Sequence, residues 1–176
     1  LVCLDIRTNE IKWQQDDLVG ELGTDKQGIF TLFVDRDNDI WMYSPLGIWV
    51  YNPEQEKWLS WLTNIIKRRS HNMVRAVSQD KQGRIWIGTD QDGIDILDKK
   101  TGEVRQLRNK AGDERSLQNN TVMVLYEDSS ETMWVGTYKK GISYFNECAF
   151  KFGAEYIGDI SCIEEDKEGY VWRSEE

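Results

Sequence analysis

Short runs of β-branched and aromatic residues alternate with turn-forming segments along most of the chain. Four such runs follow one another between residues 74 and 107, and each gap between them contains Asp or Gly. Those residues favour tight turns, and short apolar runs separated by such turns are typical of antiparallel strands. The stretch therefore predicts a meander of four strands, in which each strand pairs with the next one along the chain.

The same unit recurs four times. In each copy a tryptophan lies six residues after an aspartate, and the aspartate lies six residues after a β-branched residue. The tryptophans are Trp41, Trp86, Trp134 and Trp172; the aspartates are Asp35, Asp80, Asp128 and Asp166; the β-branched residues are Ile29, Val74, Val122 and Ile160. A four-stranded repeat of about 40–50 residues is typical of a β-propeller blade. The sequence therefore predicts an all-β fold built from four-stranded antiparallel blades.

The repeat divides the chain into three nearly complete blades and two half blades, about four blades' worth in all. Residues 4–11 resemble residues 97–104, so the chain opens with the last two strands of a unit. We expect one propeller segment, a piece of a larger propeller that forms an open arc rather than a closed four-bladed ring. Its parts are 1–15, 28–62, 73–108, 121–152 and 160–176.

Local chemistry refines two elements. Each repeated aspartate is the first residue of a four-residue turn. The fourth residue of that turn needs a positive φ, which Gly83, Gly169 and Asn38 accept. Glu131 occupies that position in the third copy, so we expect a longer or bulged hairpin there. Trp58–Leu62 is expected to form a final strand and a loop rather than a helix.

Residues that repeat in every unit are expected to be structural, because they occupy equivalent places in each blade. The tryptophans should pack between neighbouring blades, the aspartates should stabilise turns, and the Gly-Thr pair after Trp should allow close backbone approach. Asp35–Asp39 resembles a calcium loop, but Ile40 and Leu46 stand where such a loop needs Gly and Glu. We therefore expect a hairpin turn there, with neither a metal nor a cofactor.

Charge and composition exclude several classes of function. The 176 residues include 22 Lys and Arg against 31 Asp and Glu, a net charge of −9, which disfavours binding to nucleic acid. The three cysteines show no metal-ligand spacing, and His71 is the only histidine. Motifs of Ser hydrolases, P-loop enzymes and zinc proteases are absent. The segment is therefore not expected to be an enzyme.

A family resemblance adds to this interpretation. Asp80–Thr89 followed by Gly93–Ile94 resembles the two-component regulator propeller repeat, and Trp134–Thr137 followed by Gly141–Ile142 repeats the pattern. The resemblance implies a periplasmic sensor domain of a hybrid histidine kinase, the extracytoplasmic part of an inner-membrane protein. It also implies, as partners, further blades and a kinase in the same chain, a homodimeric receptor, and an oligosaccharide released from a glycan. Because the sequence starts at Leu1, we expect it to be part of a longer protein.

Ligand binding is expected on one face of the blades. The loops that enter the first strand and join the second to the third vary between copies, and variable loops on a rigid scaffold commonly carry recognition. Sugars need amides and carboxylates for their hydroxyls and an aromatic face for their C–H groups. The candidate ligand-binding residues are Asn72, Asp90, Asp92, Asn120 and Tyr138. The alternatives are a protein-interaction propeller without a small ligand and a lyase-type propeller enzyme, in which His71 would be the base.

Overall fold

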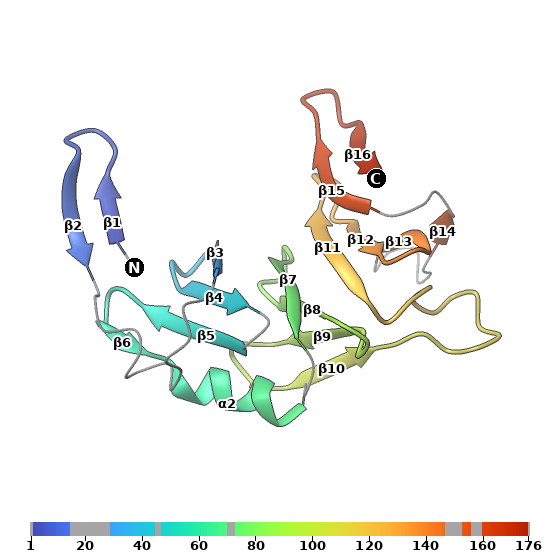
Figure 1. Ribbon diagram of the computed structural model, residues 1–176, viewed down its shortest axis with the longest axis horizontal. Coiled ribbons are helices and arrows are strands. Elements are labelled where there is room, and N and C mark those ends of the chain that lie inside the picture. Colours follow the sequence, from blue (N-terminus) through green and yellow to red (C-terminus); the bar gives the residue numbers. More distant parts are fainter. Residues whose placement is uncertain are drawn as a thin grey trace.

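The computed structural model describes residues 2–14, 29–44, 47–69, 73–146, 153–155 and 160–175. Three four-stranded antiparallel sheets follow one another in sequence and in space, flanked by a two-stranded hairpin at each end (Figure 1). In each four-stranded sheet the strands pair in chain order, which confirms the predicted all-β meander. We call these sheets blades 1, 2 and 3.

The strands of each unit are short. Blade 1 consists of β3 (Thr31–Val34), β4 (Ile40–Ser44), β5 (Gly47–Asn52) and β6 (Lys57–Trp58). Blade 2 consists of β7 (Val74–Gln79), β8 (Ile85–Thr89), β9 (Ile94–Leu97) and β10 (Val104–Leu107). Blade 3 consists of β11 (Val122–Glu127), β12 (Met133–Thr137), β13 (Gly141–Phe145) and β14 (Gly153–Glu155). The N-terminal hairpin is β1 (Val2–Asp5) with β2 (Glu10–Gln14), and the C-terminal hairpin is β15 (Ile160–Glu165) with β16 (Val171–Glu175).

The two terminal hairpins lie at opposite ends of an open arc and do not pair with each other (Figure 1). The turn of the N-terminal hairpin has the same geometry as the β9–β10 turn. The Asn9 N–H donates to the carbonyl of Asp5 at 2.7 Å, as the Gly102 N–H donates to that of Asp98 at 2.9 Å. The N-terminal hairpin therefore has the form of the last two strands of a blade, as its sequence predicts.

A hydrogen bond between the repeated aspartate and tryptophan explains their spacing. In each unit the tryptophan Nε1 donates to an Oδ2 of the aspartate, which lies across the same hairpin. The pairs are Trp41–Asp35 at 2.8 Å, Trp86–Asp80 at 2.8 Å, Trp134–Asp128 at 2.7 Å and Trp172–Asp166 at 2.6 Å. The other carboxylate oxygen accepts backbone N–H groups of the turn, as at Asp35, where the donors are Asp37 and Asp39.

The core lies between neighbouring blades. Trp41 is fully buried in a cluster that joins blades 1 and 2, and Trp86 lies in a second cluster that joins blades 2 and 3. The backbones approach closely, since a Cβ on Gly88 would lie 2.6 Å from Val122 Cγ1. Trp134 packs against the C-terminal hairpin. Trp172 is 64% exposed, so the interblade packing predicted for it is not observed among the described residues.

Backbone N–H groups on one side of the arc also join the units. In three units the backbone N–H of the residue after the repeated aspartate donates a hydrogen bond to the next unit. The acceptor is the side chain of the residue just before the repeated aspartate of that next unit. The donor–acceptor pairs are Arg36 to Gln79, Lys81 to Glu127 and Ser129 to Glu165, each at 2.8 Å. These bonds and the apolar clusters fix each blade against its neighbour.

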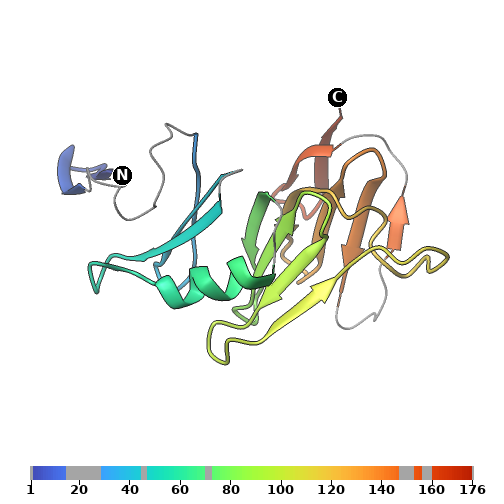
Figure 2. The ribbon, with the colours of Figure 1, turned by 60° about the horizontal axis from the view of Figure 1, so that its bottom comes forward.

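Two local predictions are wrong. Residues Ser60–Arg69 form the helix α2, which lies along blade 1 (Figure 2), because Leu62 and Ile66 bury one apolar stripe in the cluster between blades 1 and 2. Glu131 adopts φ 65° in a hairpin of the same length as the others, with its N–H donating to the Asp128 carbonyl at 3.1 Å. Hydrogen bonds from Ser130 and Thr132 to Asp128 hold that turn despite the unfavourable residue.

Candidate functional site

The arc has two faces that differ in their connections. The turn face carries the hairpins that follow the repeated aspartates. The loop face carries residues 89–93 and 137–141, which join the second strand of a blade to the third, and residues 118–121, which lead into blade 3. Four of the five predicted binding residues lie in these loop-face segments, and Asn72, like His71, lies outside the described residues.

Asp90 connects the segments of the loop face. Its Oδ2 lies 2.6 Å from an Arg75 guanidinium nitrogen, and its Oδ1 accepts a hydrogen bond from the Thr121 hydroxyl at 3.2 Å. Its N–H donates to the carbonyl of Met73 at 2.9 Å. Asp90 therefore holds the start of β7 and the segment entering β11 in fixed positions around one arginine.

Asp92 and Asn120 also stabilise the loops. Asp92 pairs with Arg108 at 3.0 Å. The side-chain oxygen of Asn120 accepts the Asn109 N–H at 2.7 Å, and its carbonyl accepts the Gly93 N–H at 2.8 Å. Both residues keep loop-face segments in register, so part of their hydrogen-bonding capacity is already taken up by partners within the chain.

Tyr138 offers an aromatic surface on the same face. Its side chain is 42% exposed, while its N–H donates to the Thr121 carbonyl at 3.0 Å and its carbonyl accepts from Asn119 at 2.7 Å. Lys139 Nζ lies 4.9 Å from the ring centroid. An exposed ring on an anchored backbone can pack against the C–H face of a sugar at low conformational cost.

A cavity of about 240 Å³ opens between the first strands of blades 1 and 2, and we call it the loop-face cavity. Arg75, which pairs with Asp90, is one of its lining residues, so the cavity adjoins the predicted loops. Its wall combines apolar and hydroxyl-bearing side chains. The lining residues are Ile29, Thr31, Tyr43, Ser44, Met73, Val74, Arg75 and Met123. Burial raises the pKa of Tyr43, so this phenol stays neutral and can donate a hydrogen bond.

The residues that line the cavity were not among the binding residues predicted from the sequence. Arg75 and Met123 occupy equivalent bulges, because register shifts fall between Val74 and Ala76 and between Val122 and Val124. A bulge turns a side chain away from the regular alternation of a strand. The sequence feature that could have identified Arg75 and Met123 is variation between the copies. The residue after the β-branched repeat position differs in every copy: Phe30, Arg75, Met123 and Ser161.

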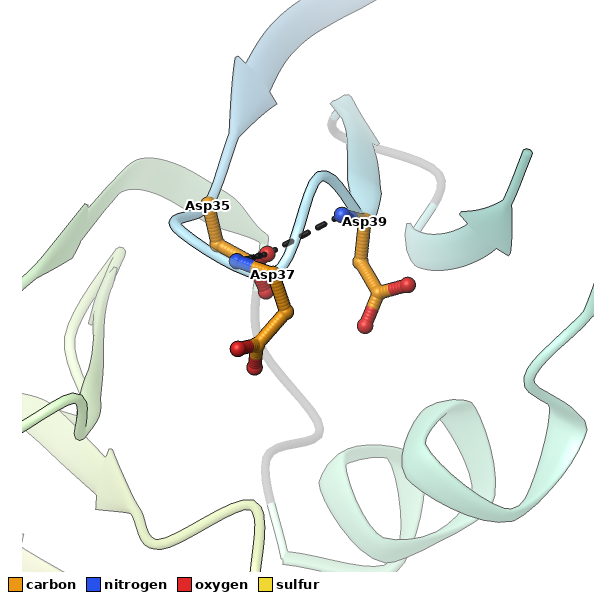
Figure 3. Close-up of side chains that lie close together, drawn as sticks. All are labelled: Asp35, Asp37 and Asp39. Atoms are coloured by element: carbon orange, nitrogen blue, oxygen red, sulfur yellow. Dashed lines mark hydrogen bonds between the residues drawn. The ribbon is translucent and has the colours of Figure 1, made fainter. Parts of the chain in front are cut away.

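Three carboxylates converge on the turn face, at the segment whose sequence resembles a calcium loop (Figure 3). Lys99 Nζ lies 2.6 Å from Asp35, 2.8 Å from Asp37 and 2.7 Å from Asp39. Burial alone would lower the pKa of Lys99, but the three hydrogen bonds raise it above its ordinary value. The ammonium group thus offsets part of the negative charge of the cluster and ties blade 2 to blade 1.

Comparison with known proteins agrees with the repeat pattern. The two-component regulator propeller model matches residues 69–91 and 116–139, which confirms the resemblance seen in the sequence. None of the curated proteins matches the chain significantly. No helix in the described part of the chain has the length and apolar composition needed to cross a membrane.

Solved structures share the fold. The extracellular domain of the hybrid two-component system BT3049 from B. thetaiotaomicron is 26% identical with a TM-score of 0.62, over 82% of this chain and 20% of that one. The extracellular domain of BT4673, from the same organism, is 17% identical with a TM-score of 0.60, over 81% of this chain and 21% of that one. Virginiamycin B lyase from Staphylococcus aureus is 12% identical with a TM-score of 0.68, over 99% of this chain and 55% of that one. The chain thus spans about a fifth of the two extracellular domains.

Proposed function

We propose that this chain, which carries two-component regulator propeller repeats, is a ligand-sensing segment of a receptor's extracytoplasmic propeller, with its binding site in and beside the loop-face cavity. The observation that carries the proposal is the position of that cavity, which shares Arg75 with the Asp90 contact network of the predicted loops. We further propose a periplasmic location and a kinase in the same protein, in line with the extracellular two-component domains that the chain resembles.

The ligand class follows from the chemistry of the site. The Arg75–Asp90 pair presents donors and acceptors to hydroxyl groups, Ser44 and Tyr43 add hydroxyls, and Met73 and Met123 provide adaptable apolar contacts. A volume of about 240 Å³ suits one or two sugar rings better than a protein segment. We therefore propose an oligosaccharide derived from a glycan as the ligand.

The ion pairs of the loop-face carboxylates favour ligand binding over catalysis. Asp90 and Asp92 are each paired with an arginine and hold loop-face segments in place, which is a structural rather than a catalytic use of these carboxylates. The likeness to virginiamycin B lyase, at 12% identity, extends to the fold alone.

Tyr138→Ala should weaken oligosaccharide binding by about fivefold, since an aromatic contact contributes on the order of 1 kcal/mol. The thermal midpoint should change little, because the ring is half exposed and its backbone bonds remain. Calorimetry with a binder selected from xylo-, manno- and galacto-oligosaccharides measures the affinity. Tyr170→Ala is the matched control, since Tyr170 is 68% exposed in a turn-face hairpin. Equal affinity of the Tyr138 variant and the unaltered chain would remove Tyr138 from the site.

A further inference from the structure

A second pocket concentrates positive charge in a chain whose net charge is −9. It is a groove of about 270 Å³ on the outer side of the arc, between β10 and blade 3. Four of its lining residues are cationic and one is acidic. The charged residues are Arg105, Arg108, Lys110, Arg115 and Asp113. We call this pocket the outer groove.

Most of these cations have no counter-charge among the described residues. Arg108 pairs with Asp92 at 3.0 Å. In the part of the chain that the structure describes, the side chains of Arg105, Lys110 and Arg115 form no ion pair or hydrogen bond, and all three residues are exposed. The Asp113 carboxylate lines the same groove and accepts the N–H of Arg115 at 3.0 Å. Like charges gathered in one pocket repel one another, and a bound anion relieves that repulsion.

The loop that carries the cations is held by internal hydrogen bonds. The Lys110 N–H donates to the Ser116 hydroxyl at 2.9 Å, and that hydroxyl donates to the Asp113 carbonyl at 2.8 Å. Asn109 Nδ2 donates to the carbonyl of Leu117 at 2.7 Å, and Leu117 is fully buried in the cluster between blades 2 and 3. Because the loop is fixed before binding, a ligand would lose little affinity to loop ordering.

We propose that the outer groove binds a saccharide that carries carboxylate or sulfate groups, at a site separate from the loop-face cavity. Guanidinium groups match both anions in geometry and form charge-assisted hydrogen bonds with them. The half-buried Leu107 and Phe145 line the groove beside the cations, so it also offers an apolar surface for a ring. The volume admits one or two sugar units with a charged substituent, and the negative charge of the chain disfavours long polyanions such as nucleic acid.

The test uses trigalacturonate, a heparin tetrasaccharide and neutral galactotriose, titrated into the chain by calorimetry at two salt concentrations. We expect one or both acidic probes to bind, more weakly at high salt, and galactotriose to bind at least about tenfold more weakly. Binding of trigalacturonate alone identifies carboxylate as the recognised group, and binding of heparin alone identifies sulfate.

Arg105→Gln with Arg115→Gln should weaken acidic binding by about tenfold or more, because charge-assisted hydrogen bonds are lost. Lys167→Gln, at an exposed position of the C-terminal hairpin, is the charge-matched control and should change the affinity little. Tyr138→Ala should leave the binding of acidic probes intact. The proposal for the outer groove and the proposal for the loop-face cavity can therefore fail independently of each other. Absence of binding by both acidic probes, equal binding of galactotriose, or full affinity in the folded double variant would overturn the proposal.

Discussion

Trp86→Ala is expected to lower the free energy of unfolding by about 3–5 kcal/mol, as for other large aromatic residues removed from a core. Trp86 is 1% exposed, its ring centroid lies 5.5 Å from that of Phe145, and its Nε1 donates to Asp80 at 2.8 Å. The variant leaves a cavity between blades 2 and 3 and removes a donor from a buried carboxylate. Urea denaturation followed by circular dichroism measures the loss.

Trp13→Ala is the matched control, because Trp13 is an aromatic outside the repeated position. It is half-buried and contacts Tyr51, with 4.8 Å between ring centroids. Its removal should therefore cost less than that of Trp86. If denaturant midpoints showed the loss of Trp13 to be the more damaging, the blade register described above would be wrong.

Lys99→Met should also destabilise the chain by about 3–5 kcal/mol at pH 7, the range expected when one partner of a buried ion pair is removed. The Lys99 side chain is 11% exposed, and those of Asp35 and Asp39 are 0% and 5% exposed. Asp37 is 69% exposed and should contribute little. Without the ammonium group, two buried carboxylates lack a counter-charge and the contact between blades 1 and 2 weakens.

The pH dependence separates this charge effect from a loss of packing. In the unaltered chain the pKa of Lys99 is raised, so its contribution is complete below its ordinary pKa of 10.5 and is lost only as the pH rises above that value. The variant lacks this contribution at every pH, so its deficit relative to the unaltered chain should shrink as the pH rises from 7 to about 11.5. Lys100→Met, at the exposed neighbouring residue, is the control. A deficit that is equal at both pH values would contradict the electrostatic explanation.

Sequence patterns predicted the parts of the fold that depend on local interactions. The spacing of Asp80 and Trp86 follows from one hairpin, whose turn and hydrogen bond involve residues six positions apart. The prediction of a strand and a loop at Trp58–Leu62 failed because contacts with residues distant in the sequence decide the structure there. The helix α2 forms because Leu62 and Ile66 pack on strands of blades 1 and 2, which the local run of residues does not reveal.

The same limit applies to the candidate site. Loop variation pointed to Asp90 and Tyr138, which the structure places on one face. Arg75 and Met123 were missed because a register shift at each strand start changes the direction of the side chain. Lys99 reaches Asp39 across 60 residues of sequence, so its place in the acidic cluster required the packing of two blades.

The methionine methyl groups test the central claim, that ligands bind in the loop-face cavity. The chain has four methionines: Met73 and Met123 line the cavity, whereas Met42 and Met133 are buried in apolar clusters elsewhere. In ¹³C-methyl NMR with a panel of neutral oligosaccharides, the account predicts that a binding sugar shifts the Met73 and Met123 signals and leaves the other two unchanged. A binding sugar that shifts Met133 and leaves Met73 and Met123 unchanged would contradict it, as would a panel in which no sugar shifts any methyl signal.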